Sequence, residues 1–424
     1  MYDQLRHDYL SCAGHKTLHT PNMDRLAAMG VRFANTYVQS PVCGASRMSF
    51  YTGRYVSSHG AAWNNFPLKV GEQTLGDHLR KLGVDSWLIG KTHMKADAEG
   101  MARLGISTDS VIGARVSECG FDIFERDDGL WAEGPDGFYD EKRSPYNEYL
   151  NSKGYEGGNP WHDYANSADE DGQMASGWFM RHASFIKPHW PYIVPAPYHN
   201  MYGHNQIQPV NRHPSEQKDP HPVYAQFQNN AAGQAFSRDE VRETVIPAYM
   251  GLIKQCAGQL GRLLDCLETS GRMEDTMIVL TSDHGDYMGD HWLGEKDLFH
   301  EPSVKVPLII YDPTADATRG TTVEALVEAI DLAPTFVEVM GGDVPENILE
   351  GRSLMPFLRG EKPADWREFA ISEYDYSATP MCANLGLKPK DARLFMVATE
   401  RYTFMHSEGG FRPMLLIGMS IRAN

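Results

Sequence analysis

The segment Cys43–Tyr55 constrains this chain more than any other, because it places a cysteine and an arginine one turn apart at the start of a predicted helix. It reads CGASRMSFYTGRY. Pro41 is disfavoured inside a helix and Gly53 readily ends one, so the helix should begin near Cys43 and carry Arg47 on the same face. Backbone N–H groups at a helix N-terminus and a guanidinium both suit a tetrahedral anion. A single cysteine is otherwise most often a small buried apolar residue.

The same segment resembles the signature of type I sulfatases, Cys-x-Pro-Ser-Arg followed by Thr-Gly-Arg, in which the cysteine is oxidised to formylglycine. The matching residues are Cys43, Ser46 and Arg47, followed by Thr52–Arg54. The resemblance implies an aldehyde hydrate as nucleophile, which expels sulfate by collapse of its second oxygen, whereas a thiolate would remain as an S-sulfonate. Ala45 stands where most aerobically processed members carry proline, which bears on the maturase that modifies the cysteine.

Composition places the chain among globular proteins and narrows its partners. With 424 residues, 42% of them hydrophobic, the chain fits one large domain with a smaller appendage, or two domains. A net charge of -17 argues against nucleic-acid binding, so an anionic substrate needs a local cationic pocket. The sequence shows neither a membrane-spanning apolar run nor a signal-peptide hydrophobic region, so we expect no membrane partner and a cytoplasmic location. The six cysteines lack metal-knuckle or redox spacing, which fits a reducing compartment.

Short apolar runs alternate with helical patterns, which predicts a layered α/β fold. Strands are expected near residues 31–33, 86–89, 183–186, 277–280 and 308–311. Helices are expected near residues 20–30, 75–82, 238–267 and 329–340, and Pro247 is a possible kink in the third of them. The polar residues 97–175 are interpreted as an insertion that covers the working edge of the sheet. A break near 355–365 separates a predicted catalytic domain, residues 1–360, from a smaller strand-rich subdomain, residues 361–424.

Polar residues follow several predicted strands, at the end where open α/β sheets bind their ligands. They are Lys91–His93, Lys187–His189 and Asp283–Asp286. Asp3 and Gln4 fit the same rule if a strand precedes them, but only two residues do. A missing central strand would expose sheet edges and loosen Asp3.

A candidate site for one divalent cation comprises Asp3, Gln4, Asp283 and His284. Oxygen ligands favour Ca²⁺ or Mg²⁺, and the histidine nitrogen makes Mn²⁺ credible; Ca²⁺ is the first choice. The sulfatase resemblance implies that the formylglycine derived from Cys43 completes this site. Family members often carry a second Asp in place of Gln4. Taken alone, an Asp-His pair is as readily a solvated turn.

Three further segments resemble family motifs: residues 90–93 (Gly-Lys-x-His), residues 187–191 (Lys-Pro-His-x-Pro) and residues 289–307 (Gly-Asp-His...Lys...Glu-x-Ser-x-x-x-Pro). By this resemblance, Lys91 and Arg47 would together hold the formylglycine hydrate and the charged oxygens.

By the same resemblance His93 would take the proton that releases sulfate. His189 and Lys296 would assist the leaving alkoxide, and Lys296 would contact the sulfate. Isolated histidines and lysines are more often ordinary surface or hydrogen-bonded residues. Asn64 is a weaker candidate for substrate binding, with a turn as its alternative.

The resemblance extends from Asp3 to about Pro413. It implies an alkaline-phosphatase-like, mainly parallel sheet flanked by helices, with a smaller C-terminal strand-rich subdomain. The predicted function is hydrolysis of an organic sulfate ester by one divalent metal and a formylglycine, installed at Cys43 by a formylglycine-generating maturase. A phosphonate monoester or phosphodiester hydrolase is the alternative, since related members share the cysteine and the Asp-Gln...Asp-His pattern. A truncated, unmodified relative that only binds anions is the non-enzymatic alternative.

Overall fold

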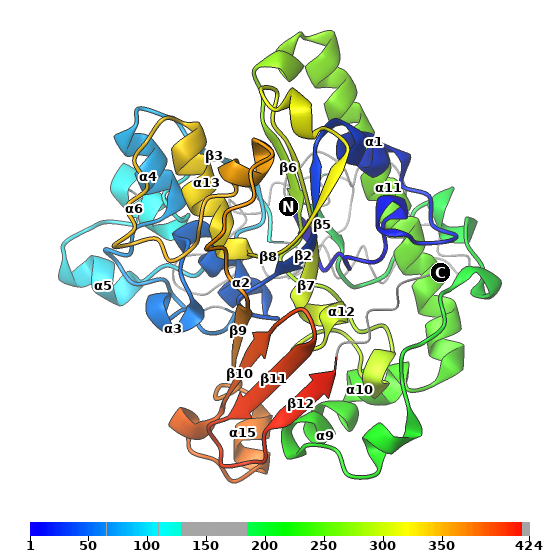
Figure 1. The fold of residues 1–424 in the computed structure, drawn as a ribbon. Coiled ribbons are helices and arrows are strands. Elements are labelled where there is room, and N and C mark those ends of the chain that lie inside the picture. Colours follow the sequence, from blue (N-terminus) through cyan, green and yellow to red (C-terminus); the bar gives the residue numbers. More distant parts are fainter. Residues whose placement is uncertain (65, 109, 129–151, 153–184, 418–424) are drawn as a thin grey trace.

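A mainly parallel sheet runs through the middle of the molecule (Figure 1) in the computed structural model, which describes residues 1–64, 66–108, 110–128, 152 and 185–417. Across the sheet its strands are β5 (Phe185–Pro188), β1 (Tyr2–Asp3), β6 (Ile278–Thr281), β7 (Lys305–Tyr311), β2 (Val31–Tyr37) and β8 (Thr321–Glu328). An isolated parallel bridge between Tyr2 and Ser282 joins β1 to the end of β6. Strand β7 pairs antiparallel with both neighbours, and the other described pairs of this central sheet are parallel. The predicted α/β fold is confirmed.

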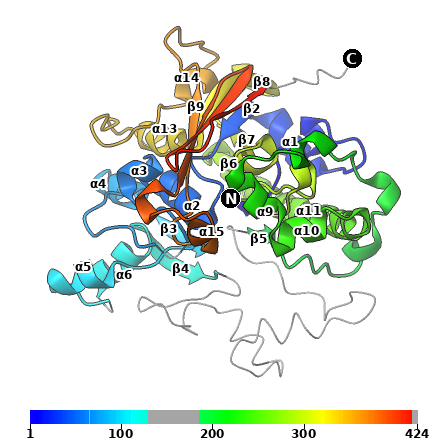
Figure 2. The same cartoon turned by 90° about the horizontal axis from the view of Figure 1, so that it is seen from below.

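Helices cover both faces of this sheet (Figures 1 and 2). On one side lie α1 (Pro21–Met29) and α11 (Asp239–Thr269), and on the other lie α2 (Cys43–Thr52), α4 (Leu75–Lys81) and α13 (Leu332–Val339). The shorter helices are α3 (Val56–His59), α5 (Ala98–Arg103), α6 (Val111–Ser117), α9 (Pro222–Gln228), α10 (Ala231–Phe236), α12 (Glu301–Val304), α14 (Met355–Leu358) and α15 (Pro380–Asn384). Among the described residues, no helix combines the length and apolar character needed to cross a membrane.

Strand β7 shows how the sequence produces a sheet covered on both faces. Leu308 and Ile310 belong to the apolar core on one side, whereas Ile309 and Tyr311 belong to the core on the other. Successive side chains of a strand point to opposite faces, so an uninterrupted apolar run is typical of a strand buried on both sides.

The same strand begins earlier than predicted, at Lys305, and runs through Pro307. Proline cannot donate to a sheet ladder, which is why the sequence favoured a start after it. The register of β2 against β7 shifts between Phe33 and Thr36, opposite the proline, and the pairing with β6 ends at Leu308. The irregularity lets the strand pass a residue that has no N–H.

Helix termini follow their local sequence signals. Helix α1 has Pro21 at its first position, and α2 ends at Gly53, whose φ of 66° is left-handed and whose N–H donates to the carbonyl of Ser49. Helix α4 begins with a capping box between Thr74 and Asp77. These signals explain why the ends of these helices, including the one that begins at Cys43, were predictable from sequence.

Two smaller sheets complete the fold. Strands β3 (Trp87–Gly90) and β4 (Asp122–Arg126) pair in parallel, and the antiparallel strands β9 (Ala370–Asp375), β10 (Arg393–Ala398), β11 (Tyr402–Ser407) and β12 (Met414–Ile417) form the C-terminal sheet below the central one in Figure 1. A strand-rich C-terminal region is therefore confirmed. Of the predicted insertion, residues 97–128 except 109 contribute α5, α6 and β4, and nearly all the rest lies outside the described residues.

A buried ion cluster links the end of β8 to the chain that enters β9. The guanidinium of Arg367 pairs with both oxygens of Asp331 and lies 3.2 Å from Glu328. Both carboxylates are almost completely buried. Glu328 also accepts hydrogen bonds from the Tyr55 hydroxyl and the Ile371 amide. One arginine thus pairs with two acids that water does not reach, and burial raises the pKa of Glu328 to about 7, so this acid is partly protonated at neutral pH.

Replacing this arginine should destabilise the fold strongly. In Arg367→Met the two carboxylates keep their burial but lose their cation, so we expect the free energy of unfolding to fall by about 3–5 kcal/mol, measured by urea denaturation. The control is Arg359→Met, which removes a half-exposed pair with Glu338 and should cost about 1 kcal/mol or less. Equal losses in the two variants would contradict the role of the cluster.

Candidate active site

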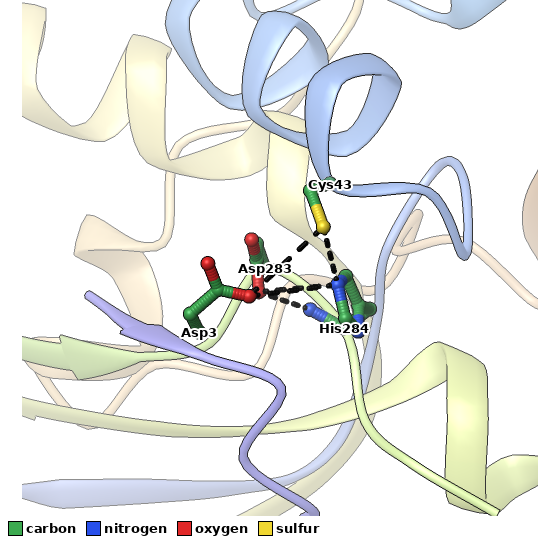
Figure 3. Close-up of side chains that lie close together, drawn as sticks. All are labelled: Asp3, Cys43, Asp283 and His284. Atoms are coloured by element: carbon green, nitrogen blue, oxygen red, sulfur yellow. Dashed lines mark hydrogen bonds and ion pairs between the residues drawn. The ribbon is translucent and has the colours of Figure 1, made fainter. Parts of the chain in front are cut away.

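Four buried side chains from three segments meet at the carboxyl end of the sheet (Figure 3). Cys43 begins α2, Asp3 ends β1, and Asp283 and His284 follow β6. The potential ligand atoms of all four lie within 4.8 Å of one another. The Cys43 Sγ atom is 2.9 Å from His284 Nε2 and 4.0 Å from an oxygen of Asp3.

The two-residue strand β1 places Asp3 in the interior of the molecule. The amide of Asp283 donates to the carbonyl of Tyr2 at 3.2 Å, and the amide of Leu5 donates to the Ser282 hydroxyl at 2.9 Å. Asp3 itself has no exposed surface. Strand β1 therefore lies between β5 and the end of β6, and these hydrogen bonds attach it to the segment that carries Asp283.

Two cations neutralise the pair of carboxylates. Arg47 donates through Nε to Asp283 at 2.8 Å and lies 3.4 Å from Asp3, while the Lys91 ammonium donates to Asp3 at 2.5 Å. All four side chains are buried. Burial opposes ionisation of Asp3, but Lys91, His189 and Arg47 together hold its pKa well below the usual range. Asp3 therefore carries its negative charge at neutral pH.

The same charges act on the cysteine. Burial alone would raise the pKa of the Cys43 thiol, but Lys296, His284 and Lys91 hold that pKa well below its usual value. The pKa of His284 rises to about 9, because Asp283 and Cys43 outweigh the desolvation of the ring. Position 43 is thus a site that favours a negatively charged group.

The donor set fits a divalent cation. The Nδ1 atom of His284 lies 2.8 Å from the carbonyl of Gly285, which can only accept, so Nδ1 carries a proton. The raised pKa means that Nε2, which faces Cys43, is also protonated at neutral pH when no cation is bound, and a bound cation would take the place of that proton. Such a second hydrogen bond is typical of metal-ligating histidines. Two carboxylates, Asp3 and Asp283, complete a set that hard cations accept. These residues could hold the predicted metal.

Gln4 lies beside this set with a left-handed φ of 65°. Its amide nitrogen donates to the carboxylate of Asp286 and lies 3.4 Å from the Tyr192 hydroxyl, and its amide oxygen accepts from Lys296 at 3.4 Å. The amide oxygen thus faces the cationic side of the site, while its role as a metal ligand stays a prediction.

A lysine and a histidine, Lys296 and His189, also lie close to the cysteine. The Lys296 ammonium is 3.0 Å from His189 Nε2, and His189 Nδ1 lies 2.6 Å from the carbonyl of Trp190. Burial and the charge of Lys296 lower the pKa of His189 to about 4, so the ring is neutral at pH 7. Lys296 is consequently the proton-bearing member of this pair.

Two predicted residues occupy less direct positions. Asn64 accepts a hydrogen bond from the amide of Gly44 at 2.8 Å and so supports the first turn of α2. The amide of His93 donates to Asp128 at 3.0 Å, and its buried Nδ1 atom has no hydrogen-bond partner in the described part of the chain. The remaining predicted residues meet around the cysteine.

Three neighbours of the site were not assigned a role from sequence: Asp286, Tyr192 and Asp128. Burial raises the pKa of Asp286, which accepts from the Tyr192 hydroxyl at 2.6 Å. Tyr192 directly follows the Lys-Pro-His-x-Pro segment, a signal that was available. Asp128 follows β4, a strand within the region interpreted as an insertion. Its position became visible only once β4 was paired with β3.

Comparison with known proteins agrees with this geometry. The sulfatase family profile matches residues 1–342, and the profile for the C-terminal region of N-sulphoglucosamine sulphohydrolase matches residues 289–408. The multifunctional alkaline phosphatase superfamily protein PehA of Trinickia caryophylli is 29% identical over 92% of this chain and 81% of its own length. The arylsulfatase of Clostridium perfringens is 26% identical over 89% of this chain and 80% of its own length.

Among solved structures, the phosphonate monoester hydrolase SpPMH from Silicibacter pomeroyi superimposes with a TM-score of 0.83 and 26% identity. The match covers 99% of this chain and 88% of that one. The sulfatase profile spans every strand of the central sheet and all four residues of the buried cysteine site. The chain therefore belongs to the sulfatase family, the sulfuric ester hydrolases of the alkaline phosphatase superfamily.

Proposed function

We propose that this chain hydrolyses an organic sulfate ester, using a formylglycine derived from Cys43 and one divalent cation. The observation that carries the proposal is the buried cluster of Asp3, Cys43, Asp283 and His284. Around it the chain places Arg47, Lys91 and Lys296, although its overall charge is -17. A sulfate group, which is anionic and tetrahedral, matches this local charge.

In this proposal Asp3, Asp283 and His284 hold the cation, with the Gln4 amide oxygen as a further ligand. The bound cation would supply positive charge to the sulfate oxygens. The oxidised side chain at position 43 would supply an oxygen nucleophile and an internal route for releasing sulfate. Calcium is our first choice of cation, because most of these ligands are oxygens, and Mn²⁺ or Mg²⁺ are alternatives.

The cations of the chain then have separate tasks. Arg47 keeps Asp3 and Asp283 ionised and in place, and Lys91 keeps a positive charge beside position 43. Lys296 donates a hydrogen bond toward the leaving oxygen, while His189 accepts from Lys296 and fixes its direction. His93 takes the proton whose removal releases sulfate. This division follows the family resemblance and the hydrogen bonds around each group.

A phosphonate monoester or phosphodiester substrate is the second candidate. Gln4 stands where many sulfatases carry a second carboxylate, which lowers the negative charge of the metal site. A less negative site would tolerate the extra charge of a phosphorus-centred transition state better. The likeness to PehA and to the phosphonate monoester hydrolase supports this candidate, whereas Lys91 and His93 favour the sulfate ester.

Modification of Cys43 should accompany activity. Tryptic peptides from protein made in its natural host should show a mass loss at this residue that matches conversion of the thiol group to an aldehyde. The same preparation should release sulfate from an aryl sulfate. In Cys43→Ala we expect kcat/KM to fall on the order of 10⁴-fold or more, because the nucleophile is gone.

The control is Cys382→Ala, which removes another buried cysteine and should retain activity. Unmodified cysteine without turnover would instead support a non-catalytic anion-binding protein.

Substrate preference separates the two enzymatic candidates. We expect kcat/KM to be higher for an aryl sulfate than for an aryl phosphonate monoester with the same leaving group. The reason is that Lys91 and His93 match the Gly-Lys-x-His motif of the sulfatases. Steady-state assays on one preparation give the ratio directly. A dominant phosphonate activity would reverse our order of the candidates.

Metal binding can be measured without turnover. After chelation and dialysis, adding Ca²⁺ at about 100 times its Kd should stabilise the protein by about 2.7 kcal/mol, seen as a rise in Tm. Asp283→Asn should abolish this rise, since one carboxylate ligand is lost. Asp265→Asn, which changes an exposed carboxylate, should leave the rise unchanged. An identical response in all three proteins would place the cation elsewhere.

A further inference from the structure

The loop that carries Lys91 and His93 is held by the end of β4. The amides of Thr92 and His93 both donate to one oxygen of Asp128, each at 3.0 Å. The amide of Asp127 donates to the carbonyl of Gly90 at 3.2 Å, which fixes the start of the same loop. One carboxylate therefore receives two consecutive backbone donors from the segment that bears two predicted active-site side chains.

The second oxygen of Asp128 belongs to a buried ion network. It accepts from Arg126 Nε at 2.7 Å, and Arg126 in turn donates to Glu118 at 2.5 Å and to the carbonyl of Met94 at 2.9 Å. The Thr92 hydroxyl lies 3.4 Å from Glu118. Glu118, Arg126 and Asp128 are each no more than 5% exposed. Both sides of the loop are thus bound by charged groups that water does not screen.

The backbone of His93 has an unfavourable, left-handed conformation that needs support from the surrounding hydrogen bonds. Its φ of 54° is left-handed, which is unfavourable for a residue with a side chain. Its Nδ1 atom is buried without a hydrogen-bond partner among the described residues. A buried imidazole nitrogen left unsatisfied carries a desolvation cost, which a bound group could relieve. The loop therefore holds His93 in a strained conformation with a ring nitrogen available.

We propose that Asp128 is a positioning residue for His93: by accepting the Thr92 and His93 amides it fixes the left-handed turn that presents the imidazole to the reacting group. The inference rests on the proposed hydrolysis, in which His93 takes a proton. Arg126 and Glu118 act indirectly: Arg126 donates to Asp128 and orients its carboxylate, and Glu118 in turn accepts from Arg126. No substrate contact by Asp128 is required.

The substitution Asp128→Asn separates positioning from simple packing. Asparagine has the same shape, but it is neutral and must turn an NH₂ group either toward the two amides or toward Arg126. Because the charged Arg126 is the stronger donor, the amide oxygen should face it and the NH₂ group should face the two backbone amides, whose hydrogen bonds are then lost. Because a displacement of about 1 Å can cost on the order of 100-fold in rate, we expect kcat to fall 10- to 100-fold while KM changes less than about threefold.

A double-mutant cycle with His93→Ala provides the decisive comparison. If Asp128 acts through His93, then adding Asp128→Asn to His93→Ala should lower kcat less than about threefold further. Equal effects in both backgrounds would overturn the proposal, because they would show that the carboxylate acts independently of His93. The matched control is Asp122→Asn at the start of β4, the strand that Asp128 follows; the Asp122 carboxylate pairs with Arg115 near the surface. This variant should keep the wild-type kcat.

Hydrogen exchange of the loop tests the geometry without any substrate. The amides of Thr92 and His93 should be protected in the wild type and exchange at least about tenfold faster in Asp128→Asn, with the amides of β3 and β4 unchanged. Unchanged protection would overturn the proposal even if kcat fell. If Asp128→Asn folds poorly, Glu118→Gln should show a smaller effect on the same two amides. A wild-type enzyme that turns over neither ester would refute the proposed function, and the exchange result would still decide how the loop is held.

Discussion

Two carboxylates buried side by side, Asp3 and Asp283, are the constraint on which the rest of the structure depends. Burying one charge without a partner is costly, and burying two like charges together costs more. Arg47 and Lys91 offset this cost through hydrogen bonds of 2.8 Å and 2.5 Å. For those bonds to form, the ends of β1, β3 and β6 must meet the first turn of α2. The convergence of these four elements therefore follows from an electrostatic requirement.

The same arrangement reconciles an acidic chain with an anionic substrate. At long range the net charge of -17 repels anions, and salt screens it beyond roughly 8–10 Å. Inside the buried site the local charges dominate, and they include Lys296 as well as the two cations beside the acids. A bound cation would make the net charge of the site more positive. Binding thus depends on short-range contacts, which select for the shape of a tetrahedral group as well as for its charge.

Sequence patterns anticipated those parts of the molecule in which local chemistry decides the outcome. The helix at Cys43 begins and ends where proline and glycine indicated, and the residues after β6 lie at the predicted edge. Sequence patterns were less informative where a residue that is unfavourable by itself, such as a proline in a strand or a buried acid, is accommodated by a partner from a distant segment. The register shift opposite Pro307 and the pairing of two buried acids with Arg367 both depend on partners far away in the chain.

The sequence by itself determined the cysteine helix, the α/β class and the set of residues that could carry the chemistry, because spacing along one segment fixes which side chains share a turn. Only the tertiary structure decided how those residues are paired. It showed that His189 shares a hydrogen bond with Lys296, that Gln4 faces Asp286, and that Asp128 holds the His93 loop. Contacts between segments depend on strand order and burial, and these arise only when the whole sheet assembles.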